Sequence, residues 1–196
     1  MKRIVFILMS WVTCLTGTAI AQEKPASTLD IRILESIAET RSDPQTQTFK
    51  VLSDINNCVQ VAVPVGLLVA GAINNDKAMR QNALYVASST AVTALVNVGI
   101  KHLIKRSRPF KKYPNFISVR TAGGYSFPSG HTSSAFATAS SLSRAYSKWY
   151  VVAPSLLWAG SVGYSRMYLG VHYPTDVLAG AVLGAGSAFA LDGLRK

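Results

Sequence analysis

The sequence predicts an all-α protein, a bundle of about five to six helices that is embedded in a membrane. Five uncharged stretches recur along the chain, over residues 55–75, 81–100, 121–143, 149–165 and 177–191. Their lengths are near or below the roughly 20 residues that cross a bilayer. They also contain Gly, Ala, Ser and Thr at the spacings that let helices pack closely in a membrane. Several stretches are short and polar enough for a soluble helical core, so a soluble bundle is the alternative.

The chain begins with the pattern of an export signal. Lys2 and Arg3 form a short basic start, residues 4–15 are an apolar run, and Ala19 to Ala21 resemble a signal peptidase site. We therefore expect a signal peptide over residues 1–21, with an uncleaved signal anchor as the alternative. Either version places the functional site outside the cytoplasm, in a bacterial cell envelope.

Residues 22–54 are polar and form the second part of the predicted organisation. Four apolar residues in this segment, Ile31, Ile33, Leu34 and Ile37, repeat at helical spacing. We expect an amphipathic helix here, either on the surface of the protein or lying at the membrane interface. The third part, residues 55–196, is then the helical domain that carries the site.

The distribution of charge predicts an anion-binding protein. The formal net charge is +11, and no Asp or Glu occurs between Asp76 and Asp176, a span that carries twelve Lys or Arg residues. Paired-carboxylate chemistry and a carboxylate-bridged two-metal centre are therefore hard to build in this half of the chain. Because Cys14 lies in the expected signal peptide, only Cys58 is left, and no cysteine metal site or redox pair is expected.

Neither nucleic acid nor a bound cofactor is an expected partner. Basic stripes commonly bind phosphate backbones. In this chain, however, the basic residues alternate with long apolar stretches, and no aromatic side chains are interleaved with them as a stacking platform.

The distribution of basic residues fits the topology of a membrane protein better than a nucleic-acid surface. With an external N-terminus, the basic loops 76–80 and 144–148 and the tail 195–196 fall on the inner side, as the positive-inside rule requires. The site would then face the periplasm from the inner membrane.

The segment from Ser165 to Asp176 carries the strongest local signal for chemistry. Pro is favoured at the first position of a helix, so Pro174 is expected to open one just after His172. Asp176 then lies in the first helical turn, where it can accept a hydrogen bond from one imidazole nitrogen of His172. The other imidazole nitrogen is left as a nucleophile or a base.

Two further segments predict phosphate-binding groups. Lys101 and Arg108 are seven residues apart, two helical turns, and can point toward one anion before Pro109 ends the helix. Ser129 and Gly130 precede His131 at the start of the next helix. Backbone N–H groups at such a helix start suit phosphate oxygens.

These segments, K-x6-R-P, P-S-G-H and S-R-x5-H-x3-D, resemble in this order the three signature motifs of the type 2 phosphatidic acid phosphatase superfamily. That superfamily includes lipid phosphate phosphatases, bacterial acid phosphatases and vanadium haloperoxidases. The resemblance covers about residues 55–191, and the sequence around His172 is most similar to the membrane-bound branch. It implies that His172 attacks phosphorus and forms a phosphohistidine, while Asp176 fixes the imidazole tautomer.

The same resemblance implies roles for the other motif residues. His131 would protonate the leaving oxygen and then activate water. Five groups would hold the phosphoryl oxygens without a metal: Lys101, Arg108, Arg166, Ser129 and Gly130.

The resulting prediction is a metal-independent phosphatase that hydrolyses a phosphomonoester or pyrophosphate of a lipid. Phosphatidic acid, phosphatidylglycerol phosphate, undecaprenyl pyrophosphate and a lipid A phosphate all carry the group that the motifs bind. The alternatives are a soluble periplasmic acid phosphatase of broad specificity, a vanadium-dependent haloperoxidase, and an anion-binding protein without turnover. The sequence leaves the choice of substrate and the oligomeric state open.

Overall fold

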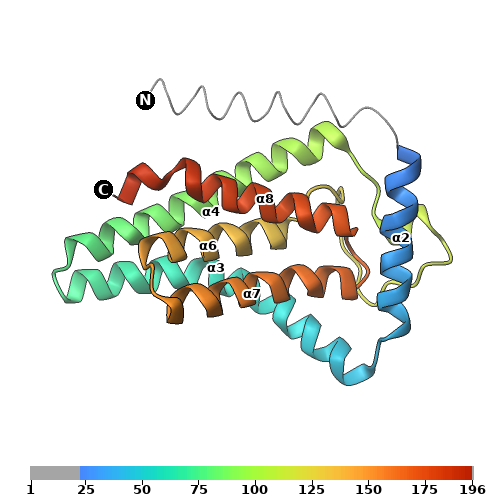
Figure 1. Ribbon diagram of the computed structural model, residues 1–196, viewed down its shortest axis with the longest axis horizontal. Helices are drawn as coiled ribbons and strands as arrows, with labels where there is room; N and C mark the ends of the chain where they lie inside the picture. The colour runs from blue at the N-terminus through green and yellow to red at the C-terminus, as the bar shows by residue number, and fades with distance from the viewer. Residues whose placement is uncertain (1–22, 196) are drawn as a thin grey trace.

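A computed structural model describes residues 23–195, and these residues form a helical bundle with no β-strand (Figure 1). The long helices are α2 (Glu23–Glu39), α3 (Asp43–Ile73), α4 (Lys77–Ile104), α6 (Gly130–Ala145), α7 (Trp149–Tyr168) and α8 (Pro174–Ala190). Two short elements, α5 (Pro109–Lys112) and η1 (Asp192–Arg195), complete the described part. The predicted all-α bundle is therefore confirmed, while the expected signal segment, residues 1–21, lies outside the described residues.

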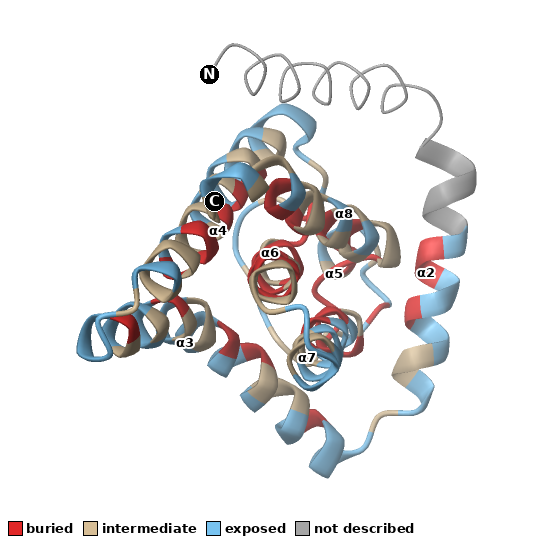
Figure 2. Ribbon diagram, turned by 60° about the vertical axis from the view of Figure 1, so that its left-hand side comes forward, coloured by how far each residue is buried: buried red, intermediate tan, exposed pale blue. Residues whose placement is uncertain are grey.

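Helix α6 lies at the centre of the bundle, and its packing against α8 is the closest in the fold. Figure 2 shows α6 surrounded by α4, α7 and α8, with most of its residues buried. A Cβ atom added to Gly184 would lie 2.1 Å from the carbonyl oxygen of Ser133, and one added to Gly180 would lie 2.8 Å from that of Ser129. Glycine on α8 therefore lets the two backbones touch. This contact holds the first turns of α6 and α8 side by side.

Two segments are long and apolar enough to cross a membrane, Asp43–Ile73 and Lys77–Lys112. Only 17% of the most apolar window of the first and 33% of that of the second is buried inside the protein. Their outward faces carry large apolar side chains, such as Val61 at 63% and Leu95 at 74% exposed. An apolar surface of this extent on α3 and α4 is suited to lipid rather than to water.

The amphipathic helix α2 is more deeply packed than the predicted surface helix. Ile31 and Leu34 are buried and pack in one cluster with Phe116 and Tyr173. Figure 1 shows α2 crossing one end of the bundle. The expected boundary after residue 54 falls within α3, which runs through it without a break.

The two ends of the bundle carry different loops. The α3–α4 turn, the α6–α7 turn and the C-terminus lie at one end, and α2 with the loops before α6 and α8 lies at the other (Figure 1). The predicted inner-side loops, 76–80 and 144–148, are therefore together. The three motif segments meet at the opposite end.

Candidate active site

Four helix ends bring the motif residues together. Lys101 lies in the last turn of α4 and Arg166 in the last turn of α7, while His131 lies in the first turn of α6 and Asp176 in that of α8. The N-termini of α6 and α8 carry partial positive charge, which adds to that of the basic side chains. The site is therefore electropositive both in its backbone and in its side chains.

His172 and Asp176 are arranged as their spacing predicts. Helix α8 begins at Pro174, and the Asp176 carboxylate accepts a hydrogen bond from the Tyr173 backbone N–H at 2.9 Å. The same carboxylate oxygen lies 3.4 Å from Nδ1 of His172. Both side chains are buried, at 2% and 0% exposed. The start of α8 thus fixes the carboxylate that orients the imidazole.

The partners of His172 define its tautomer. The Nε2 atom lies 3.2 Å from a terminal nitrogen of Arg108, and a guanidinium can only donate hydrogen bonds. Nε2 is therefore the acceptor, and the proton is on Nδ1, toward Asp176. Burial lowers the pKa of the His172 imidazole to about 4, against the opposing effect of the Asp176 carboxylate. The result is a neutral imidazole whose Nε2 lone pair faces the Arg108 guanidinium.

Arg108 is held in place by carbonyl groups. Its guanidinium donates to the carbonyl oxygens of Gly123 at 2.7 Å and Val171 at 2.9 Å, and the side chain is buried. These bonds join the loop before α6 to the loop before α8. The remaining contact of the guanidinium is with Nε2 of His172, at 3.2 Å.

The other two predicted cations are fixed differently. Arg166 is 3% exposed and donates to the hydroxyl of Ser53 on α3, while its Nε has no partner among the described residues. The Lys101 ammonium donates to the carbonyl oxygens of Tyr125 at 2.9 Å and Pro128 at 2.8 Å. In this arrangement Lys101 fastens the loop that leads into α6.

Ser129, Gly130 and His131 form the start of α6. Ser129 is the N-cap, and its buried hydroxyl accepts hydrogen bonds from the Thr132 hydroxyl at 2.8 Å and the Thr132 backbone N–H at 3.5 Å. The half-buried imidazole of His131 makes no hydrogen bond with another residue of the described range 23–195. It is therefore free to bond a substrate.

Arg106 and Asp30 are two site residues to which the motifs assign no role. Arg106 donates to Asp176 at 2.7 Å and to Asp30 at 2.7 Å. Asp30 on α2 is 2% exposed and also accepts from the Thr175 hydroxyl at 2.6 Å. The Arg106 guanidinium stacks on the Tyr173 ring, 3.9 Å from its centroid. One guanidinium thus joins α2 to the carboxylate that orients His172.

Ser126 is a further residue that the motifs miss. Its hydroxyl donates to Asp176 on the oxygen that faces His172. The Asp176 carboxylate therefore accepts hydrogen bonds from Ser126, Arg106 and the Tyr173 N–H, and these bonds fix its orientation.

Among the described residues, no group of three or more His, Cys, Asp or Glu side chains is arranged to hold a metal ion.

A family model described as the PAP2 superfamily matches residues 82–192, more than half of the chain. The chain belongs to the PAP2 superfamily. The match includes every motif residue discussed above and excludes α2 and α3.

Several named phosphatases align with about half of the chain. A decaprenylphosphoryl-5-phosphoribose phosphatase from Mycolicibacterium smegmatis is 38% identical over 117 residues, covering 59% of this chain and 61% of that protein. A lipid A 4'-phosphatase from Bacteroides thetaiotaomicron is 33% identical over 101 residues, covering 48% and 45%. An undecaprenyl-diphosphatase from Sulfolobus acidocaldarius is 31% identical over 114 residues, covering 58% and 55%. The chain therefore spans about half the length of these relatives.

Two solved structures share the fold of this chain. A transmembrane PAP2-type phosphatidylglycerolphosphate phosphatase from Bacillus subtilis superposes with a TM-score of 0.72 at 23% identity, covering 98% of this chain and 96% of that one. LpxE from Aquifex aeolicus superposes with a TM-score of 0.68 at 25% identity, covering 83% and 94%. The helical arrangement of this chain, including α2 and α3, is thus that of a PAP2 membrane protein.

Proposed function

We propose that this protein is a metal-independent lipid phosphatase that hydrolyses a phosphomonoester or diphosphate through a phosphohistidine. The observation that carries the proposal is the buried His172, neutral and with its Nε2 lone pair 3.2 Å from Arg108. A nucleophile held beside a cation is what attack on a phosphoryl group requires. The named relatives are phosphatases of lipid-linked or lipid A phosphates, which supports this function over halide oxidation or broad acid phosphatase activity.

In the first step, Nε2 of His172 forms a bond to phosphorus as the bond from phosphorus to the leaving oxygen breaks. The electron pair leaves with that oxygen, which takes a proton from His131 in its imidazolium form, a form that the negative charge of the bound phosphoryl group stabilises. Asp176 stabilises the positive charge that develops on the imidazole. In the second step His131 activates a water molecule, which displaces the phosphoryl group from His172 and releases inorganic phosphate.

The basic groups bind the phosphoryl oxygens during both steps. Arg108 turns its donors from the imidazole to the entering phosphate, and the unpartnered Nε of Arg166 gives a second charged donor. The Gly130 N–H at the start of α6 provides a further one. Ser129 acts through its cap on α6, and Lys101 acts by holding the preceding loop.

The site is proposed to face the periplasm from the inner membrane, because the charged turns at the opposite end follow the positive-inside rule.

The test is phosphate release by the detergent-purified protein, with EDTA present, from a panel of lipid phosphates and one soluble phosphoester. We expect turnover of a lipid far above the soluble ester, and a loss of at least about 1,000-fold in His172→Ala. The matched control is His102→Ala, because His102 is exposed on α4 and belongs to no motif. Full activity in a folded His172→Ala protein would contradict the mechanism, and loss of activity on chelation would contradict metal independence.

A further inference from the structure

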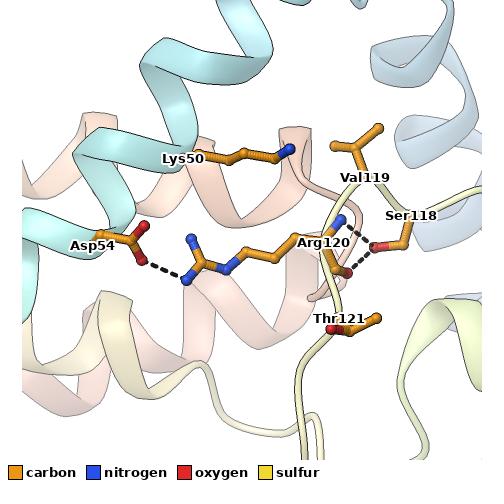
Figure 3. A pocket seen from close by; sticks show the side chains of 6 residues that line it. All are labelled: Lys50, Asp54, Ser118, Val119, Arg120 and Thr121. Carbon is orange, nitrogen blue, oxygen red and sulfur yellow. Dashed lines mark hydrogen bonds and ion pairs between the residues drawn. The ribbon is translucent and has the colours of Figure 1, made fainter.

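A cavity of about 500 Å³ lies between α3 and the loop before α6, beside the proposed catalytic residues (Figure 3). This volume is within the range of ligand pockets, about 300–1,000 Å³. The cavity is lined by Lys50, Asp54, Ser118, Val119, Arg120 and Thr121. None of these residues belongs to the three motifs.

The charges of the cavity are arranged to receive an anion. Figure 3 shows Lys50 extending from α3 and Arg120 from the facing loop into the same space. Arg120 forms an ion pair with Asp54, whose side chain is 58% exposed. The Lys50 ammonium has no hydrogen-bond or ion-pair partner among the described side chains, residues 29–195. The cavity therefore holds one unpaired cation, Lys50, and one cation paired with a solvent-accessible carboxylate, and an entering anion can displace Asp54 from Arg120.

The cavity adjoins the phosphoryl site on the side of His131. Asp54 follows Ser53, the residue whose hydroxyl binds the Arg166 guanidinium. The charges of Arg120 and Asp54 are both close enough to act on the His131 imidazole. In the proposed mechanism, His131 protonates the leaving oxygen, so the cavity lies where the leaving group departs.

We propose that Arg120 and Lys50 bind the second phosphate of a diphosphate substrate, the phosphate that leaves with the lipid. This assignment rests on the proposed phosphatase function and names its substrate class. His172 forms its bond to the terminal phosphorus, and the anhydride bond between phosphorus and the bridging oxygen breaks. The bridging oxygen keeps the electron pair, takes a proton from His131 and remains on the lipid monophosphate. Arg120 and Lys50 then stabilise the charge on that leaving phosphate.

The loop that carries Arg120 is anchored, so the cation is pre-positioned. The Ser118 hydroxyl lies 2.8 Å from the carbonyl oxygen of Leu169 and 2.5 Å from that of Arg120, and its single proton is shared between these two acceptors. Leu169 lies at the end of α7, three residues after Arg166. The cavity wall is thus tied to the helix that holds a phosphoryl-binding cation.

The test compares farnesyl diphosphate with farnesyl monophosphate as substrates of the detergent-purified full chain. In Arg120→Ala we expect kcat/KM for the diphosphate to fall about tenfold or more, and that for the monophosphate to change less than about threefold. Lys50→Ala should act in the same direction. Asp54→Asn should lower KM for the diphosphate, because it frees Arg120. The control for lost positive charge is Lys111→Ala, an exposed residue outside the cavity.

A second readout needs no turnover and no lipid. Methylenediphosphonate should raise the melting temperature of the wild-type protein at lower concentrations than inorganic phosphate does, and Arg120→Ala should remove that preference. Equal losses on both farnesyl substrates, or no preference for the diphosphonate, would overturn the proposal. Diphosphonate binding without any phosphate release would instead contradict the phosphatase function and leave the anion site standing.

Discussion

The imidazole of His172 sits in a pocket that keeps it neutral, and this has a measurable consequence. Since burial lowers its pKa to about 4 from the ordinary value of 6.5, the group is unprotonated from neutral pH down to about pH 5. It becomes protonated only as the pH falls through about 4. We expect the nucleophile to be available over this whole range.

An NMR titration of protein labelled at histidine ring carbons measures this directly. The resonance assigned to His172, by its absence in His172→Gln, should have a midpoint near pH 4. A midpoint near 6.5 would show that the imidazole is not desolvated as described, and would remove the argument for a neutral nucleophile.

The ion pair between Asp30 and Arg106 predicts the effect of a single substitution on stability and turnover. In Asp30→Asn the half-buried Arg106 loses one of its two carboxylate partners and Thr175 loses a charged acceptor. Removing one partner of a buried ion pair costs about 3 kcal/mol. We expect a lower melting temperature and a lower kcat, because Arg106 also positions Asp176. The exposed Glu35→Gln on the same helix is the matched control and should change neither.

Some contacts of the site can be predicted from the sequence alone, and others cannot. His172 and Asp176 are four residues apart, and a helix start between them was enough to predict their contact, which the structure places at 3.4 Å. Asp30 lies 146 residues from Asp176, and no local spacing connects them. One signal was present, since Asp30 shares a helical face with Leu34 and Ile37, and an acid among apolar positions needs a buried partner.

At the scale of elements, the contact of α6 with α8 sets the positions of the two helix starts in the site. Gly184→Ala would place a methyl group against the backbone of Ser133 and Ala137, at 2.1 and 2.7 Å. Overpacking of this kind costs typically 1–3 kcal/mol. We expect a lower melting temperature in detergent and reduced turnover.

Gly160→Ala is the matched control for that substitution. Gly160 lies in α7 with no atom within 4 Å of an added Cβ, so alanine should be tolerated there and should favour the helix. Equal stability of the two variants would mean that α6 and α8 can separate without cost.

The helix boundaries show where sequence patterns are limited. The uncharged stretch 121–143 is longer than the helix within it. Helix α6 begins at Gly130, as the P-S-G-H segment predicts, but the stretch does not reveal that residues 121–129 form a loop held by Lys101 and Arg108. Those hydrogen bonds join residues that are far apart in the sequence, so they produce no periodic pattern of apolar residues from which the loop could be predicted. By contrast, α4, α7 and α8 lie close to their predicted stretches, because continuous apolar runs bounded by charged residues or Pro mark their ends.

At the scale of the whole molecule, the proposed orientation in the membrane can be tested by cysteine labelling. In a protein with Cys14 and Cys58 replaced by serine, Lys111→Cys lies at the end with the site and Lys148→Cys at the other. We expect a membrane-impermeant maleimide to label the first in intact spheroplasts and the second only after lysis. The reverse pattern would put the site in the cytoplasm.

The ion pairs of Arg106 with Asp30 and Asp176 determine which part of the chain must be moved if the site is transplanted to another protein. A chimaera that transplants residues 82–192 into another bundle would carry Arg106, Thr175 and Asp176. It would leave behind Asp30, so a guanidinium balanced by two acids in the native chain would be balanced by one. A designer who moves this chemistry to a new scaffold should therefore graft helix Glu23–Glu39 with it, or build a replacement acid at the same place.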